Sequence, residues 1–156
     1  MTDLICGIDI GTKNTGLVLL DLKGNIYRLF LISSDKKDVN ERIKIIAKEV
    51  DEILGRYKPQ LVIVEKTIMI QNFITSSVLT ELLGIFRWLC IEYELNFDTV
   101  PNKTWKKHVS GNGNAKKEDT LAEAKRLWPS GNFESNDVSD AACIAKYGLL
   151  KFQGKL

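Results

Sequence analysis

Three short apolar runs open the chain, and their length and composition predict strands. Residues 4–10, 15–22 and 26–33 are rich in Leu, Ile and Val, as buried or half-buried strands are. The polar, glycine-containing stretch 21–25 separates the last two runs as a hairpin turn would. The sequence therefore predicts three strands at the start of the fold, antiparallel to one another.

Helical and strand patterns alternate through the rest of the chain. Apolar side chains recurring at steps of three and four predict helices over residues 39–57 and 75–93. Continuous apolar runs predict a buried central strand at 61–65 and a short strand at 97–100. Three further helices are expected at residues 101–108, 116–128 and 135–150. This order predicts an α/β fold with one five-stranded mixed sheet flanked by helices.

Length and composition restrict the class of protein. At 156 residues, with 44% hydrophobic and 27% charged residues, the chain suits one globular domain spanning residues 1–156. No apolar run reaches the ~20 residues that a bilayer span requires, and no basic segment precedes the first apolar run. We therefore expect a soluble, intracellular protein of the cytoplasm with no membrane partner.

The cysteines and the single histidine argue against a zinc site or a disulfide framework. Cys6, Cys90 and Cys143 are far apart in apolar sequence, and His108 has no second histidine to join it. Buried, reduced thiols are the natural interpretation.

Basic residues concentrate in one segment, although the net charge of +2 is too small to indicate a nucleic-acid partner. Residues 101–117 contain His108, no acid and five lysines: Lys103, Lys106, Lys107, Lys116 and Lys117. A solvated surface is the default interpretation of any one of these lysines. A glycine-hinged basic segment without acids can also hold a phosphate backbone without reading bases, and we favour DNA.

Four carboxylates stand at unusual places. Asp9 and Glu65 each end an apolar strand, where an ionised group costs free energy unless it is hydrated or paired. If these strands are parallel neighbours, both carboxylates emerge at the same edge of the sheet. Asp137 and Asp140 are three residues apart at the start of the last helix and project from one of its faces. The three elements together can bring four acids into one cluster.

Such a cluster has a chemical use. Hard divalent ions relieve the repulsion among carboxylates, and oxygen-only ligands suit Mg²⁺, with Mn²⁺ as a substitute. Two such ions can activate water and stabilise both oxygens of an in-line phosphoryl displacement. Taken singly, a strand-end acid is often only a loop residue, and Asp137 suits the dipole of a helix N-terminus.

Four segments of the chain stand out as a set. They are Gly-Ile-Asp-Ile-Gly-Thr-Lys-Asn-Thr-Gly at 7–16, Val-Ile-Val-Glu at 62–65, Val-Ser-Gly-Asn-Gly-Asn-Ala-Lys-Lys at 109–117 and Asp-Val-Ser-Asp-Ala-Ala at 137–142. In their order and separations, over nearly the whole chain, they resemble the successive motifs of RuvC-type Holliday junction resolvases, of the RNase H-like or retroviral integrase superfamily.

The resemblance implies a homodimeric, Mg²⁺-dependent endonuclease that makes paired nicks in four-way DNA junctions, with two ions at each active site. It places the metal-binding, catalytic acids at Asp9, Glu65, Asp137 and Asp140. It also places basic residues near the scissile phosphate at Lys106 and Lys117, the latter catalytic. The predicted DNA-binding residues are Lys13, Lys66, Ile68, Lys103, Lys106, Lys107, Lys116 and Lys117.

Three residues depart from the family pattern. Ile10 replaces a common proline, Lys66 replaces a common Gln, and Ile68 stands where an aromatic wedge is frequent. An aliphatic side chain still unstacks bases, but aromatic stacking is lost. We therefore expect relaxed sequence and structure selectivity, with branched DNA such as forks also cut.

Two questions stay open from the sequence. The helix at 75–93 is apolar over more than one stripe, so it is either buried on several sides or forms a two-fold dimer interface.

The glycine motif at 7–16 also resembles a phosphate loop of actin-like and sugar-kinase ATPases, but this chain has no second such loop. A non-catalytic binder of branched DNA and an RNA-processing relative are further alternatives. A phage, virus, bacterium or organelle would suit as the source, and the sequence leaves open whether a branch-migration motor is a partner.

Overall fold

A five-stranded mixed sheet forms the centre of the computed structural model, which describes residues 2–66 and 72–156. The strands in sheet order are β3, β2, β1, β4 and β5. Strand β1 pairs antiparallel with β2 and parallel with β4, while β2–β3 is antiparallel and β4–β5 parallel. Their bounds are β1 Leu4–Asp9, β2 Asn14–Asp21, β3 Ile26–Ser33, β4 Leu61–Glu65 and β5 Asn96–Val100.

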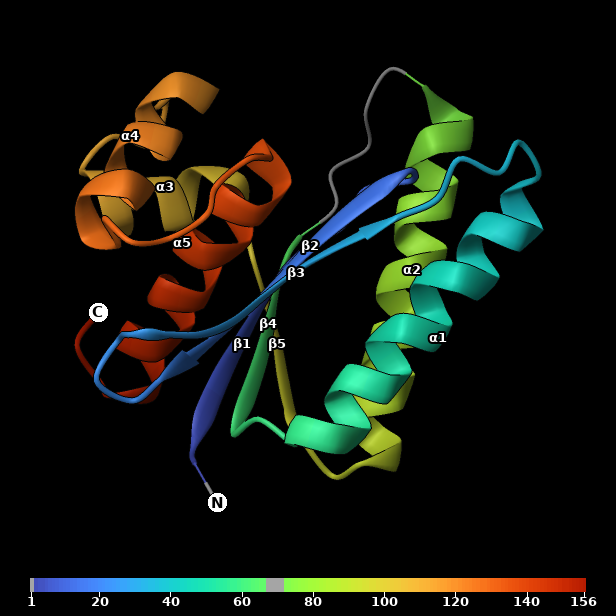
Figure 1. Cartoon of the computed structure of the whole chain (residues 1–156), viewed down its shortest axis with the longest axis horizontal. Helices are drawn as coiled ribbons and strands as arrows, with labels where there is room; N and C mark the ends of the chain where they lie inside the picture. Colours follow the sequence, from blue (N-terminus) through green and yellow to red (C-terminus); the bar gives the residue numbers. More distant parts are fainter. Residues whose placement is uncertain (1, 67–71) are drawn as a thin grey trace.

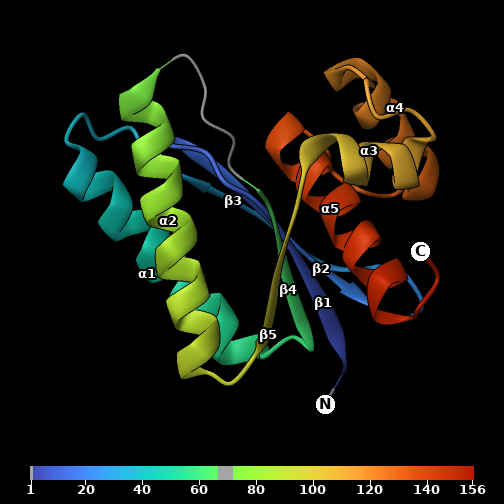
Figure 2. The same cartoon turned by 180° about the vertical axis from the view of Figure 1, so that it is seen from behind.

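Helices cover both faces of this sheet (Figures 1 and 2). Two of them, α1 and α2, lie on one face, and α3, α4 and α5 gather on the other. Their bounds are α1 Val39–Tyr57, α2 Phe73–Glu92, α3 Asn102–Ser110, α4 Lys117–Leu127 and α5 Asn136–Phe152. The predicted fold class is confirmed, and each predicted element ends within two residues of the observed bounds.

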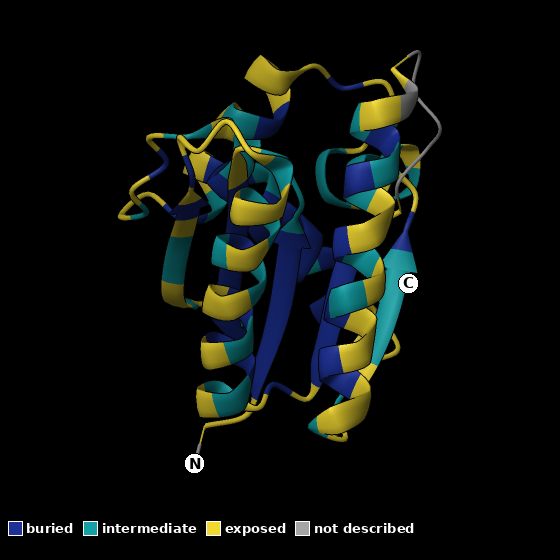
Figure 3. Cartoon of the chain, turned by 90° about the vertical axis from the view of Figure 1, so that its right-hand side faces the viewer, coloured by how far each residue is buried: buried dark blue, intermediate teal, exposed yellow. Residues whose placement is uncertain are grey.

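Alternation along the central strands produces two separate cores. On β1, Cys6 and Ile8 pack with the apolar residues of α1 and α2. On β2, Val18 and Leu20 point the other way and pack with α5 and Trp105. Burial on both faces explains why these strands are continuous apolar runs (Figure 3).

The three cysteines are free and buried, as the sequence predicts. Burial raises the pKa of Cys90 to about 11 and that of Cys143 to about 12, and it raises the pKa of Cys6 as well. The thiols therefore stay protonated and behave as small apolar groups.

Helix α2 has more apolar surface than the core uses. By length and composition alone, Ile74–Glu92 would suffice to cross a bilayer, with mean hydropathy 1.4. Leu82 and Phe86 are fully buried against the sheet, as in a core helix of a folded domain. On the outer side, however, Trp88 is 56% exposed and Ile91 66% exposed. This outer side is available for another contact.

Candidate metal and DNA-binding site

The first two acids come together through the register of the parallel strands β1 and β4. Ile8 pairs with Val64, so Asp9 and Glu65 are the next residues on neighbouring strands. Both stand at the carboxyl ends of their strands, at the same edge of the sheet. The chain is anchored there by the N–H of Lys66, which donates to the carbonyl of Val100 at 2.7 Å.

The second pair of acids reaches this edge because α5 lies unusually close to the sheet. A Cβ at Gly7 would lie 2.4 Å from the carbonyl oxygen of Ala141, and a Cβ at Gly16 would lie 2.2 Å from that of Asp137. Both glycines are therefore required by close approach, since such contacts cannot be relieved without moving backbone. Gly16 pairs with Asp9 across β1–β2, so the start of α5 is held over the strand that carries the first acid.

The carboxylates influence one another strongly. Burial, and then the charges of Asp140, Glu65 and Asp137, raise the pKa of Asp9 well above its usual value, while Lys117 lowers it. Burial also raises the pKa of Asp140 to about 6, against a hydrogen bond from Thr120 that lowers it. The charges of Glu65 and Asp137 raise the Asp140 pKa further, and that of Lys106 lowers it. Four acids and two lysines thus share one electrostatic environment.

Neutral donors hold three of the acids. Ser135 Oγ donates to Asp137 Oδ2 at 3.2 Å. Thr120 Oγ1 donates to Asp140 Oδ1 at 3.1 Å. Glu65 Oε2 accepts from Trp105 Nε1 at 2.7 Å and from Asn102 Nδ2 at 3.1 Å.

Within residues 2–66 and 72–156, no three His, Cys, Asp or Glu side chains form a closed metal-holding group. Like charges repel one another, and the carboxylates of Glu65, Asp137 and Asp140 instead each accept from a neutral donor.

The donor chemistry of the cluster fits a hard divalent cation. All four candidate ligands are carboxylates, and none of the three cysteines is among them. Oxygen-only sites suit Mg²⁺ and Mn²⁺ rather than zinc. A cation bound among these acids would offset the repulsion and the burial that raise the pKa of Asp9.

The basic residues divide into two groups. Lys106, on α3, and Lys117, the first residue of α4, are the two whose charge acts on the acids. The other five predicted DNA-binding lysines are exposed, and their assignment stays a prediction: Lys13, Lys66, Lys103, Lys107 and Lys116. Ile68, the predicted wedge, lies outside the described residues. Gly111, with φ of 81°, ends α3 and begins the turn that leads to α4 and Lys117.

Sequence reasoning missed the neutral partners of the acids. Asn102, Trp105 and Thr120 lie 20 to 40 residues from the carboxylates that they contact, so no local pattern relates them. Trp105 could have been noticed in the sequence, because it is the one Phe, Trp or Tyr residue in the basic segment 101–117. Ser135 was predicted as the start of the last helix, and it is the N-cap whose hydroxyl accepts from the N–H of Asp137 at 3.1 Å.

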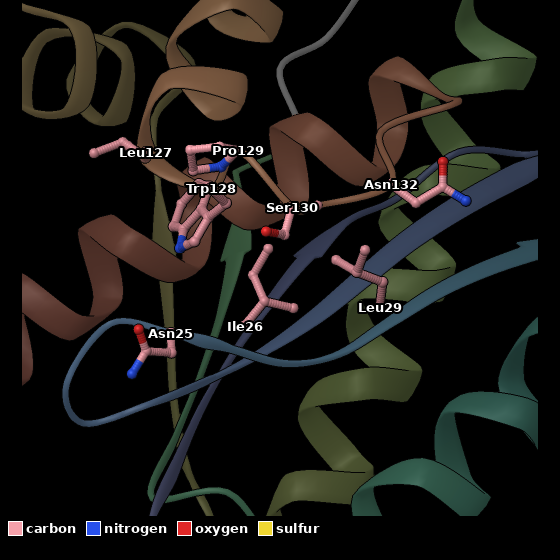
Figure 4. Close-up of a pocket in the computed structure, with 9 residues that line it drawn as sticks. Asn25, Ile26, Leu29, Leu127, Trp128, Pro129, Ser130 and Asn132 are labelled. Carbon is pink, nitrogen blue, oxygen red and sulfur yellow. The ribbon is translucent and has the colours of Figure 1, made fainter.

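A hollow of about 480 Å³ lies elsewhere, between β3 and the connection from α4 to α5 (Figure 4). Leu29, Trp128 and Asn132 are among its lining residues. The indole of Trp128 is fixed at this hollow by a hydrogen bond, in which Nε1 donates to the carbonyl of Gly24 at 2.8 Å. None of the four acids lines this hollow in the described part of the chain.

A family model and individual proteins that resemble this chain carry the same description. The family model described as crossover junction endodeoxyribonuclease RuvC matches residues 5–146. The proteins of that name from Bartonella tribocorum and Rickettsia akari are 32% and 30% identical to this chain. The alignments cover 90% and 91% of this chain and 85% and 94% of those proteins, respectively.

A solved structure of Thermus thermophilus RuvC in complex with a Holliday junction substrate superposes with a TM-score of 0.85 at 21% identity. It covers 98% of this chain and 97% of that one, and it supports the RNase H-like fold inferred above. RuvC proteins generally use Mg²⁺. The match over residues 5–146 shows that this chain belongs to the RuvC family of crossover junction endodeoxyribonucleases.

Proposed function

We propose that this RuvC family member resolves four-way DNA junctions by Mg²⁺-dependent, paired nicking of phosphodiester bonds. The observation that carries the proposal is that four carboxylates from β1, β4 and α5 lie near enough for their charges to act on one another, with Lys106 and Lys117 also acting on them. An acid cluster beside a basic segment is suited to phosphodiester hydrolysis, because it combines cation binding with attraction for the phosphate backbone.

Asp9, Glu65, Asp137 and Asp140 would hold the metal. Two Mg²⁺ ions, with Mn²⁺ as substitute, are the proposed complement, and when bound they supply an activated water and charge stabilisation for an in-line displacement. The chain itself supplies the placement of these ligands. Strand register sets Asp9 beside Glu65, and the close approach of α5 sets the other two above them.

Lys106 and Lys117 act on the phosphate in this proposal. An ammonium group near the acids attracts the DNA backbone toward the cluster and offsets negative charge on the reacting phosphate. The exposed lysines Lys13, Lys66, Lys103, Lys107 and Lys116 extend this attraction along the backbone without reading bases.

The outer side of α2 is the proposed homodimer interface. Ile74 is 71% exposed, and a Cβ at Gly84 would have nothing within 4 Å. Gly84, Trp88 and Ile91 follow at steps of four and three, so they share one helix face. The open space at Gly84, one turn before Trp88, allows a second helix to approach closely. A two-fold dimer would present two active sites to the opposed strands of a junction.

Relaxed selectivity is a further part of the proposal. Lys66, exposed directly after the metal-binding Glu65, and Ile68 replace residues common in the family. Neither can supply aromatic stacking at the junction centre. We expect forks and other branched duplexes to be cut as well, and strict, sequence-specific cutting of four-way junctions alone would refute this part. The expected location is the cytoplasm, or that of the host for a phage protein.

The deciding experiment uses an end-labelled four-way junction incubated with the protein, with and without Mg²⁺. We expect paired nicks that require the metal and that Asp9→Asn abolishes while junction binding remains. Metal-independent binding without nicking by the unaltered protein would favour the non-catalytic binder. ATP hydrolysis without DNA cleavage would favour the actin-like or sugar-kinase alternative.

A further inference from the structure

Two hydrogen bonds converge on one oxygen of the Glu65 side chain. Trp105 Nε1 donates at 2.7 Å and Asn102 Nδ2 donates at 3.1 Å, both to Oε2. Hydrogen bonds to an ionised acceptor are stronger than those between neutral groups. With Oε2 saturated by two donors, Oε1 is the oxygen of this carboxylate left for a cation.

Strand register and helix geometry explain why these donors meet Glu65. Glu65 pairs with Val100 at the end of β4–β5. Pro101 then caps α3, so the helix begins at Asn102, two residues beyond the partner of Glu65. Asn102 and Trp105 are three apart and therefore lie on the same face of α3. That face is directed back at the end of β4.

Trp105 is the more rigid of the two donors. Its side chain is fully buried, and it packs in the core formed with Val18, Ile63 and α5. A buried indole N–H must find an acceptor, and the packed ring cannot turn to find another. Lys106 Nζ also lies over the Trp105 ring, 5.7 Å from the ring centroid.

We infer that Trp105, assisted by Asn102, is a positioning residue that orients the Glu65 carboxylate for metal binding. This inference rests on the proposed metal-binding role of Glu65. A glutamate has three side-chain torsions, and ordering them on metal binding costs conformational entropy. The two donors hold the carboxylate in one orientation beforehand, as outer partners of metal ligands do in other sites.

The chain offers a matched control for testing this inference. Trp128 is also buried and also donates its indole N–H, but to the backbone carbonyl of Gly24. Trp105→Phe and Trp128→Phe therefore remove the same kind of hydrogen bond while keeping an aromatic ring. The probe is Mg²⁺ alone, titrated calorimetrically into the DNA-free protein, with the Mg²⁺-dependent rise in Tm as a second measurement.

Trp105→Phe should weaken Mg²⁺ binding about tenfold, within the range found for loss of outer partners of metal ligands. Trp128→Phe should lower Tm without changing Mg²⁺ affinity. Asn102→Ala, at a half-buried position, should weaken Mg²⁺ binding in the same direction and serves as the test if Trp105→Phe does not fold. In the junction assay, raised Mg²⁺ should restore the nicking rate of Trp105→Phe.

Combining Trp105→Phe with Glu65→Gln separates the inference from the proposed function. If Glu65 carries the effect, Trp105→Phe should add no further loss of Mg²⁺ affinity in the Glu65→Gln background. If Glu65→Gln weakens Mg²⁺ binding but Trp105→Phe and Asn102→Ala do not, Trp105 is only a core residue and the inference is wrong. If Glu65→Gln itself leaves Mg²⁺ affinity unchanged, the proposed metal site fails and the inference with it.

Discussion

The clustered acids should make the metal-free protein less stable than a variant with one charge removed. Asp140→Asn is the informative change, because the amide is nearly isosteric and its Oδ1 can still accept from Thr120. Asp140 has a pKa of about 6, raised from 3.8 chiefly by burial and also by Glu65 and Asp137. A folded-state pKa above the unfolded value means that the ionised form opposes folding.

The magnitude follows from that pKa. Each pKa unit corresponds to about 1.36 kcal/mol, so the ionised Asp140 side chain costs on the order of 2 to 3 kcal/mol of folding free energy above pH 7. For a chain of this size, 1 kcal/mol shifts Tm by roughly 2–4 °C. We therefore expect Asp140→Asn to raise Tm by about 5–10 °C at pH 8 in EDTA.

The pH dependence supplies the sharper test. The native carboxyl keeps its proton between pH 3.8 and about 6, where the unfolded chain has lost it. Asp140 therefore makes the stability of the unaltered protein fall as pH rises through this window, and the Asp140→Asn variant lacks this contribution. Asp9, whose pKa is also raised, lowers stability in both proteins. The difference in Tm between variant and unaltered protein should be roughly half as large at pH 5 as at pH 8.

Thermal unfolding followed by circular dichroism would measure these differences. Asp98→Asn is the matched control, since burial raises the pKa of Asp98 but its hydrogen bond from Lys151 leaves it lowered overall. That control should not raise Tm. Mg²⁺ should raise Tm more for the unaltered protein than for Asp140→Asn. A Tm gain that is absent, or that does not change with pH, would refute the reasoning.

Three further predictions follow from the site and the α2 surface. Gly16→Ala would place its Cβ 2.2 Å from the Asp137 carbonyl oxygen, so we expect α5 to shift and kcat to fall about 100-fold; unchanged nicking would contradict the required close approach. Lys117→Ala should weaken junction binding and reduce the slope of log affinity against log salt by about one, and an unchanged slope would remove Lys117 from the phosphate contacts. Trp88→Glu should convert a dimer into a monomer in analytical ultracentrifugation, and a monomer at micromolar concentration without the substitution would defeat the proposed interface.

Much of the fold was predictable because burial leaves a local record in the sequence. A strand covered on both faces, such as β4, must be apolar at consecutive positions, and a half-buried helix such as α1 must repeat at three and four residues. These rules predicted the five strands and the helices α1 and α2 within two residues, and the expected bounds of α3, α4 and α5 are equally close to those observed. They also predicted Asp9 and Glu65 as strand-end acids, because an ionisable residue interrupts an apolar run visibly.

The parts of the site that depend on distant pairs were decided only in three dimensions. Nothing near Glu65 in the sequence indicates that its oxygen accepts from Asn102 and Trp105, 37 and 40 residues away. Nothing near Gly16 in the sequence shows that the backbone of Asp137 packs directly against it, where a side chain would clash. Nothing in the sequence of α2 shows that Ile74, Trp88 and Ile91 are exposed while Leu82 and Phe86 are buried. Sequence periodicity records how much of each residue is buried, whereas the identity of its contacts depends on strand register and helix-to-sheet distance, which only the packed chain determines.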